Sequence, residues 1–190
     1  MSVLSDRTIR DLCTGDTPLI SPFVGESIRE VESGSKIPSY GLSSYGYDIR
    51  LEPGFELMKE NFDRVIDPCK PSDEMYERVE GETCIIPPHG YLLANTVEYF
   101  RIPNNVTTMC LTKSTYARLG IMINVTPLEA GWEGQLVVEI ANLTPHPVLI
   151  TSNVGIAQVV FLRGDLPCET SYADRNGKYQ GQTGITHAKV

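Results

Sequence analysis

The sequence predicts a mainly β protein, a sandwich or barrel with only a few short helices. Glycine and proline are abundant, with 16 Gly and 13 Pro among 190 residues, which favours many short strands over long helices. After Cys84 the chain becomes a series of short apolar runs separated by turn residues. No helix-length apolar period interrupts these runs, so a doubly wound α/β sheet is disfavoured.

The first part of the chain carries weaker signals. Residues 5–13 place apolar side chains three apart behind a capping serine, which predicts a short amphipathic helix. Residues 21–40 are polar and rich in glycine and serine without a clear period, so we expect a long surface loop. Residues 72–79 predict a second short helix that ends near a glycine.

The second part supplies the strands, and the predicted runs are CIIP, YLLANTVEYF, VTTMCL, IMINV, QLVVEIAN, PVLI and GIAQVVFL. Proline, asparagine and glycine clusters break the chain between them. The tail from about residue 172 to 190 combines glycines with cationic and amide side chains. Two interpretations remain open for this tail: a frayed terminus, or a mobile segment that recognises a ligand.

Length and charge limit the classes of protein that this chain can represent. With 190 residues we expect one domain spanning 1–190. The start MSVLSDRTIRDLC has no apolar signal core, and no apolar run reaches membrane-spanning length, so we expect a soluble cytoplasmic protein and no membrane contact. The net charge of −8 argues against a nucleic-acid partner. Residues 113–190 are balanced at 6 Lys+Arg and 6 Asp+Glu, so local cations can still bind an anion.

Two metal or phosphate motifs are missing. Zinc deaminases carry H-x-E followed by P-C-x-x-C, and neither half is present. The five cysteines form no C-x-x-C pair and the three histidines lie far apart in the sequence, so we expect neither a zinc ion nor another bound metal. A P-loop needs glycine at positions 107 and 112, where this chain has threonine.

One predicted strand, residues 135–142, carries a carboxylate among apolar neighbours. Alternation places Gln135, Val137 and Glu139 on one face and the larger apolar residues on the other. Burial would disfavour the charged carboxylate and raise its pKa, so that Glu139 could take a proton from water and return it. An edge-strand charge that prevents aggregation is the alternative interpretation.

The segment TKSTYARLG, residues 112–120, predicts a single helical turn with Ser114 as its cap. A helix start offers free N–H donors to phosphate. Lys113 and Arg118 add cationic donors, and Ser114 and Thr115 add hydroxyl groups. A plain helix cap with exposed cations explains the same residues, and the segment alone does not decide between the two.

Seven segments together resemble the dCTP deaminase family, and the resemblance covers nearly the whole chain. They are SSYGYDIR (43–50), VEYFRIP (97–103), KSTYARLGI (113–121), NVTPLEAGWEG (124–134), VVEIAN (137–142), GIAQVVF (155–161) and SYADRNGKYQGQTG (171–184). The resemblance implies a distorted jelly-roll β-barrel of the dUTPase-like type. It also implies a homotrimer with active sites between subunits.

The implied reaction is the zinc-independent hydrolytic deamination of dCTP to dUTP and ammonia, a step toward dUMP and dTTP. Through the resemblance, Glu139 matches the catalytic carboxylate that activates water. Ser114 and Arg118 match residues that position this water and stabilise the developing charge.

The resemblance further implies a set of nucleotide-binding residues, a substrate that carries Mg²⁺ on its triphosphate, and feedback inhibition by dTTP. The tail would close over the triphosphate. The implied substrate-binding residues are Lys113, Ser114, Thr115, Tyr116, Ala117, Arg118, Val137, Val138, Glu139, Gln158, Tyr172, Lys178 and Gln182.

The chain departs from the family pattern in the turn segments. Thr112 stands where relatives commonly have glycine, Ala130 and Gly131 replace a proline-containing pair, and Lys113 replaces an arginine of some members. Two alternatives to a deaminase alone remain. One is a bifunctional enzyme that also hydrolyses dUTP to dUMP and pyrophosphate, for which Glu129 is the nearest carboxylate; the other is a non-catalytic nucleotide-binding regulator.

Overall fold

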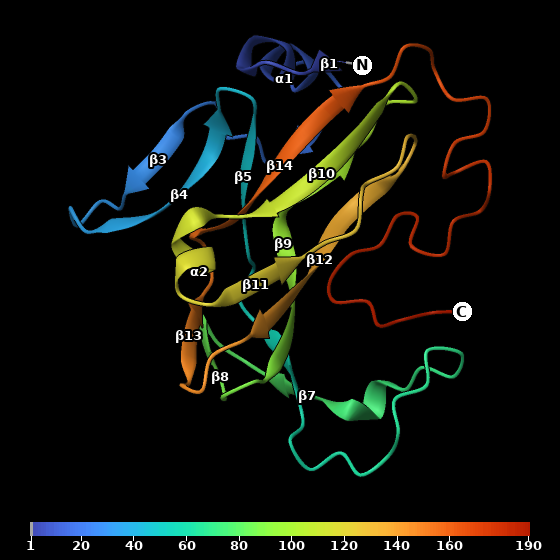
Figure 1. Cartoon of the computed structure of the whole chain (residues 1–190). Helices are drawn as coiled ribbons and strands as arrows, with labels where there is room; N and C mark the ends of the chain where they lie inside the picture. The colour runs from blue at the N-terminus through green and yellow to red at the C-terminus, as the bar shows by residue number, and fades with distance from the viewer. Residues whose placement is uncertain (1) are drawn as a thin grey trace.

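The computed structural model describes residues 2–190 and contains two six-stranded sheets and one strand pair (Figure 1). The first sheet has the order β1-β14-β5-β4-β3, with β10 also paired to β14. Its paired strands are antiparallel. Their bounds are β1 Ser2–Val3, β3 Ser27–Glu30, β4 Lys36–Ser43, β5 Gly46–Arg50, β10 Val106–Thr112 and β14 Gly155–Arg163.

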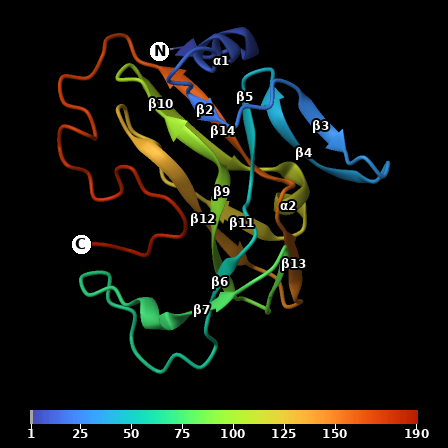
Figure 2. The ribbon, with the colours of Figure 1, turned by 180° about the vertical axis from the view of Figure 1, so that it is seen from behind.

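The second sheet has the order β11-β12-β9-β6-β7, with β2 paired to β9 (Figure 2). Strands β8 and β13 form the separate pair. Their bounds are β2 Ile20–Ser21, β6 Phe55–Met58, β7 Tyr76–Val79, β8 Thr83–Ile86, β9 Tyr91–Arg101, β11 Ile121–Asn124, β12 Glu133–Asn142 and β13 Val148–Thr151. All seven apolar runs predicted as strands after Cys84 are therefore confirmed.

The helices are few and short, as predicted. Helix α1 spans Asp6–Leu12 behind Ser5, η1 is a single 3₁₀ turn at Asp73–Met75, and α2 spans Ser114–Arg118. The expected cap of α2 is wrong by one position, because Lys113 is the N-cap and Ser114 is already helical. Gly120, which ends this turn, has φ +73°, a conformation that favours glycine.

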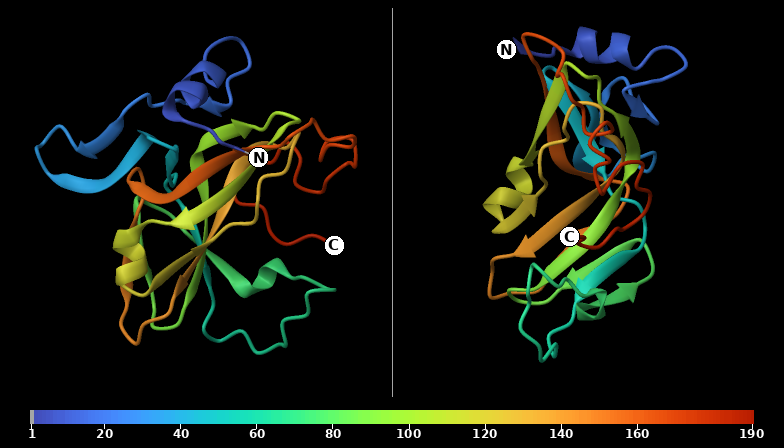
Figure 3. Two further views of the ribbon diagram at one scale, coloured as in Figure 1. Left: turned by 45° about the horizontal axis from the view of Figure 1, so that its top comes forward. Right: turned by 90° about the vertical axis from the view of Figure 1, so that its right-hand side faces the viewer.

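Two expectations for the first part of the chain are wrong. Residues 21–40 are not one loop: β3 and most of β4 lie in it and form a hairpin that projects from the body of the molecule (Figure 3). Residues 72–79 contain only the η1 turn before β7, which pairs with β6. In both cases pairing with a neighbouring strand decided the structure, because neither segment has a strong period of its own.

The core lies between the inner faces of the two main sheets. Ile49 and Phe161 from the first sheet and Phe100 and Ile140 from the second are fully buried. The rings of Phe100 and Phe161 meet across the core with centroids 6.5 Å apart. Val138 is fully buried beside them, so the predicted alternation along β12 is confirmed. The opposite face of β12 is left for other contacts.

Helix α2 and the C-terminal tail lie on opposite sides of this framework in Figures 1 and 2. The tail runs beside β12 as an irregular chain and ends near the loop before β7. In the described part of the chain, no helix has the length and apolar character needed to cross a membrane.

Candidate functional site

A cavity of about 760 Å³ lies between the outer face of β12, the turn after β11 and the tail. Five of its lining side chains are aromatic, and three are charged. The lining residues are Tyr76, Tyr91, Leu93, Asn124, Val125, Thr126, Pro127, Leu128, Glu129, Trp132, Leu136, Val137, Glu139, Tyr172, Lys178, Tyr179, Gln182, Thr186 and Ala188. This size and mixture suit a small organic ligand with a planar part and a few polar groups.

Glu139 lies on the wall of this cavity at the middle of the sheet. It is paired with Asn124 of β11 on one side and with Leu93 of β9 on the other. Burial raises the pKa of Glu139 to about 7 from an ordinary value of 4.5. Its Oε2 is buried without a hydrogen-bond partner among the described residues. The carboxyl group can therefore change its protonation state near neutral pH and is free to bind a ligand or water.

The tail forms the outer wall of the cavity. Trp132 donates its indole N–H to the carbonyl of Tyr179 at 3.0 Å, and Gln182 donates its side-chain amide to the carbonyl of Gln135 at 2.8 Å. The backbone N–H of Tyr179 donates to the hydroxyl of Tyr172 at 3.1 Å. These bonds join the tail to β12, to the turn before it and, within the tail itself, to Tyr172.

The other two charged residues of the cavity wall, Glu129 and Lys178, have different partners. Glu129 forms an ion pair with Arg175 of the tail, and both side chains are about half exposed. Lys178 contacts the carbonyl of Lys189 and lies over the ring of Tyr179 at 5.4 Å from its centroid. One cation and one carboxylate thus face the ligand space in addition to Glu139.

The predicted turn segment 113–118 does not line this cavity. Four of its side chains are exposed to solvent, namely Ser114, Thr115, Ala117 and Arg118, whereas Tyr116 is buried in the core. The guanidinium of Arg118 approaches only the carbonyl of Ser114, at 3.5 Å. Within one chain, the two groups expected to assist Glu139 therefore lie outside its cavity.

Lys113 belongs to a second polar cluster formed with residues of β4, β5 and β14. Its ammonium group forms an ion pair with the buried carboxylate of Asp48 and donates to the hydroxyl of Ser39 at 3.1 Å. The side-chain amide of Gln158 donates to the same Asp48 at 3.1 Å and to Ser43 at 3.0 Å. Lys113 and Gln158 thus meet at Asp48, and neither residue lines the Glu139 cavity.

The predicted residues thus divide into two sets. Val137, Glu139, Tyr172, Lys178 and Gln182 line one cavity. The segment 113–118 and Gln158 lie elsewhere, and the side chain of Val138 faces the core.

Several lining residues were not singled out as site residues. Tyr91 and Leu93 lie on β9, and Tyr76 lies on β7. Alternation along β9 could have grouped the first two on one face, but only the strand register places them beside Glu139. No sequence pattern indicated that Tyr76 lines a site, and residues 72–79 were expected to form a helix rather than a strand of this sheet.

Among residues 2–190, no cluster of three or more His, Cys, Asp or Glu side chains has the geometry of a metal site. The polar groups that line the cavity can form hydrogen bonds, and Glu139 can also transfer a proton.

A mainly β fold that encloses an aromatic cavity around a titratable carboxylate defines a class of small-molecule-binding or catalytic barrels. A model of the family described as "dCTP deaminase-like" matches residues 3–164. The chain belongs to this family, which confirms the resemblance found in the sequence.

Curated relatives of equal length agree with this assignment. A dCTP deaminase from Acidithiobacillus ferrooxidans is 52% identical over 190 residues, with all of both chains covered. A dCTP deaminase from Burkholderia mallei is 49% identical, again with all of both chains covered.

A solved structure, a 2'-deoxycytidine 5'-triphosphate deaminase from Agrobacterium tumefaciens, matches with a TM-score of 0.60 at 21% identity. The match covers 85% of this chain and 48% of that chain, so this chain spans about half of that protein. At this identity the likeness shows the fold, and it confirms the predicted fold class.

Proposed function

We propose that the protein catalyses the hydrolytic deamination of dCTP to dUTP and ammonia in the cytoplasm, as one domain spanning residues 1–190. The observation that carries this proposal is Glu139, a half-buried carboxyl group with a pKa of about 7 on the wall of an aromatic cavity. The full-length relatives named dCTP deaminase support the choice of substrate.

In the proposed mechanism, ionised Glu139 removes a proton from a water molecule that attacks C4 of the cytosine ring. The protonated carboxyl group gives this proton to the ring nitrogen N3, where it stays in the uracil product. The carboxylate then takes the proton of the new C4 hydroxyl group and passes it to the leaving amine as the C4=O bond forms. The C4–N bond breaks, ammonia leaves, and the carboxylate is regenerated. A group with a pKa near the working pH suits both halves of this cycle, because it gains and loses the proton at similar cost. No step needs zinc.

The rest of the cavity binds the nucleotide in this proposal. Val137 borders the base and sugar, and Val138 contributes through its backbone, since its side chain is in the core. Tyr172, Lys178 and Gln182 contact the nucleotide from the tail. Mg²⁺ arrives on the triphosphate as part of the substrate.

A complete site requires a second copy of the chain, and we propose a homotrimer with sites between subunits. Support comes from the exposed positions of Ser114 and Arg118 outside their own chain's cavity. Apolar side chains near this region are also unusually exposed: Met109 51%, Leu111 50%, Leu119 61% and Met122 46%. In the proposed assembly, α2 of a neighbouring copy brings its Lys113–Arg118 segment to the Glu139 cavity.

Subunit mixing tests the shared site. Glu139→Gln and Arg118→Ala are each expected to be inactive alone, whereas joint refolding of equal amounts should restore up to about a quarter of the sites. Recovery requires that Glu139 and Arg118 come from different chains. Light scattering should give three chains per particle, and a monomer that turns over dCTP would contradict the shared site.

Product analysis tests the reaction itself. Purified protein with dCTP and Mg²⁺ should release ammonia and dUTP in equal amounts. Release of pyrophosphate would instead favour the bifunctional alternative, for which the position of Glu129 on the cavity wall is the relevant observation. Binding of nucleotide without any product would favour the regulator.

We further propose that dTTP inhibits by occupying the same cavity. Rates measured against increasing dTTP should fall, and the inhibition should weaken as dCTP is raised. Rates that do not respond to dTTP would contradict this part of the proposal.

A further inference from the structure

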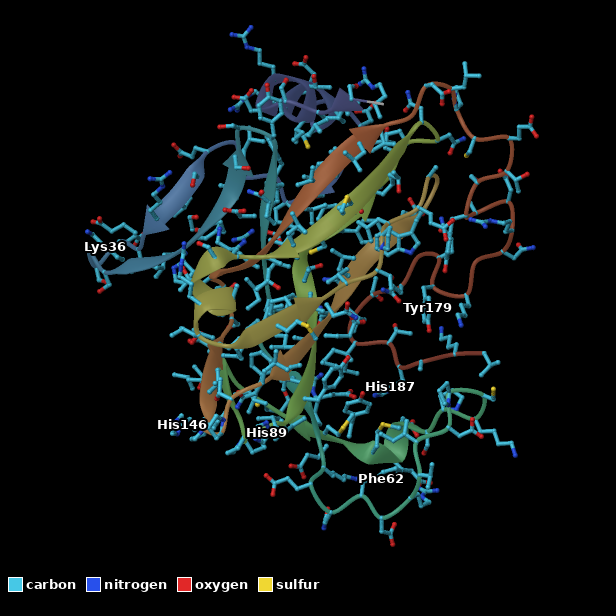
Figure 4. The ribbon with its side chains drawn as sticks, viewed as in Figure 1. Lys36, Phe62, His89, His146, Tyr179 and His187 are labelled. Atoms are coloured by element: carbon cyan, nitrogen blue, oxygen red, sulfur yellow. The ribbon has the colours of Figure 1, made fainter. Side chains whose placement is uncertain are left out.

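The far end of the tail is attached to the sheet by a contact that the proposed chemistry does not use. Nε2 of His187 forms a hydrogen bond with Oε2 of Glu56 on β6. The imidazole also stacks on the ring of Tyr76 on β7, with centroids 5.5 Å apart and planes at 27°. The side chains of His187 and Glu56 are only 31% and 16% exposed. We call these three residues the clasp (Figure 4 labels His187).

The clasp lies on the same face of the sheet as Glu139. Leu93 of β9 is paired with Glu139 on one side and with Glu56 on the other. Directly paired residues share a face, so Glu56 lies two strands from Glu139, or about 10 Å away. Tyr76 itself lines the cavity. The clasp therefore closes the cavity at the end opposite β11.

The clasp also completes the attachment of the tail. Upstream, the N–H of Gly184 donates to Oε1 of Gln135 on β12 at 2.9 Å. His187 follows three residues later and reaches β6 on the far side of β9. Thr186 and Ala188, its neighbours in the chain, line the cavity. The tail thus spans the cavity between one attachment on β12 and a second on β6.

We propose that His187 is a positioning residue that holds the closed tail over the Glu139 cavity through Glu56 and Tyr76. This inference rests on the proposed function, because the tail is the part of the chain that would contact the triphosphate. A tail fixed at both ends has already lost much of its conformational freedom before the nucleotide binds. Removal of the clasp should therefore weaken substrate binding and leave the proton-transfer step at Glu139 largely intact.

The test combines a measurement of the tail with steady-state kinetics. His187→Ala should raise KM for dCTP about tenfold and change kcat less than about twofold, since a hydrogen bond to a charged group is lost. In the nucleotide-free protein, hydrogen exchange at residues 184–188 should become faster, with no change in β12. Glu56→Gln, which preserves shape, should produce the same pattern, and the double variant should add little to either single variant.

His146→Ala is the matched control, because His146 is an exposed histidine in a turn (Figure 4). It should leave both KM and tail exchange unchanged. A His187→Ala variant with unchanged KM, or with unchanged tail exchange, would overturn the inference, as would strictly additive effects with Glu56→Gln. If the unaltered protein releases no ammonia from dCTP, the proposed function fails, while the exchange measurement still decides whether the clasp holds the tail.

Discussion

Two carboxylates on neighbouring strands of the same sheet have opposite surroundings. Glu98 of β9 is fully buried and is met by Arg50, which donates its backbone N–H at 2.9 Å and its Nε–H at 2.8 Å. Burial raises the pKa of Glu98, and these bonds and the charge of Arg50 oppose that rise. Glu139 of β12 is less buried, yet one of its oxygens has no partner among the described residues.

Burial alone does not identify a functional carboxylate. Glu98 has its hydrogen-bonding capacity used inside the protein, so it stabilises the junction of β5 and β9 and offers nothing to a ligand. Glu139 has an oxygen without a hydrogen-bond partner beside a cavity. Burying that unpaired oxygen costs free energy of folding, which other interactions in the protein offset.

Glu139→Gln should reduce turnover of dCTP by at least about 10³-fold, because the amide keeps the shape of the side chain but cannot accept the proton from water. Nucleotide binding, measured by calorimetry, should remain within about threefold of the original value. The free energy of unfolding should stay equal or rise slightly, because an unpaired buried carboxylate is removed. A variant with a near-normal rate would remove Glu139 from its proposed role.

Glu98→Gln should act on stability rather than chemistry. The substitution leaves the charge of Arg50, whose side chain is 14% exposed, without its partner, so we expect a loss of about 3 kcal/mol in the free energy of unfolding. Urea denaturation provides the measurement. The double variant Arg50→Gln/Glu98→Gln should be less unstable than the sum of the single variants, and additive losses would mean that the pair does not act as a unit.

The pH dependence should distinguish activity from stability at Glu139. Because its pKa in the folded protein is about 7, kcat/KM should fall about tenfold per pH unit below pH 7. Stability depends on pH in the opposite direction to activity. The raised pKa of Glu139 stabilises the folded protein fully below about pH 4.5, and this stabilisation is lost as the pH rises through 7.

Unfolding of the original protein and of Glu139→Gln, compared at pH 5.5 and pH 8, isolates this contribution. The original protein should lose more stability than the variant between these two pH values. An identical change in both proteins would contradict a raised pKa at Glu139.

Arg78→Gln should have the smallest effect on the free energy of unfolding, because it removes an exposed ion pair rather than a buried one. Arg78 and Glu80 form an Arg–Glu contact at 2.9 Å, close to the length of the Arg50–Glu98 contact, but their side chains are 48% and 77% exposed. Water screens such a pair, so the free energy of unfolding should change by less than about 1 kcal/mol. A loss as large as that of Glu98→Gln would show that burial is not the deciding factor.

Much of the site could be predicted from local patterns, but only in separate pieces. Alternation along β12 placed Glu139 on the face opposite the core. The composition of the tail left open both a frayed terminus and a recognition segment. The roles of Tyr91 and Glu56 could not be predicted, since they depend on the register of β9 and β6 against β12. The contact of His187 with Glu56 joins residues 131 positions apart, and no local pattern encodes it.

The errors in the first part of the chain have the same origin. The hairpin of β3 and β4 was expected to be a loop, and β7 was expected to be helical. Both segments form short strands because a neighbouring strand supplies hydrogen bonds. Their own sequences have no clear strand periodicity. Where apolar residues repeat regularly, as in β9 and β12, the prediction was confirmed.

By itself, the sequence determined the β class, the family and the strands after Cys84, because apolar patterns and motifs depend on residues that are close together in the chain. It left open whether Glu139 is partly buried or exposed on an edge strand. The tertiary structure alone decided that the tail lies across the Glu139 cavity and that α2 lies away from it. Those relationships join segments far apart in the chain, and they are set by strand register and packing, which act only once the sheets have assembled.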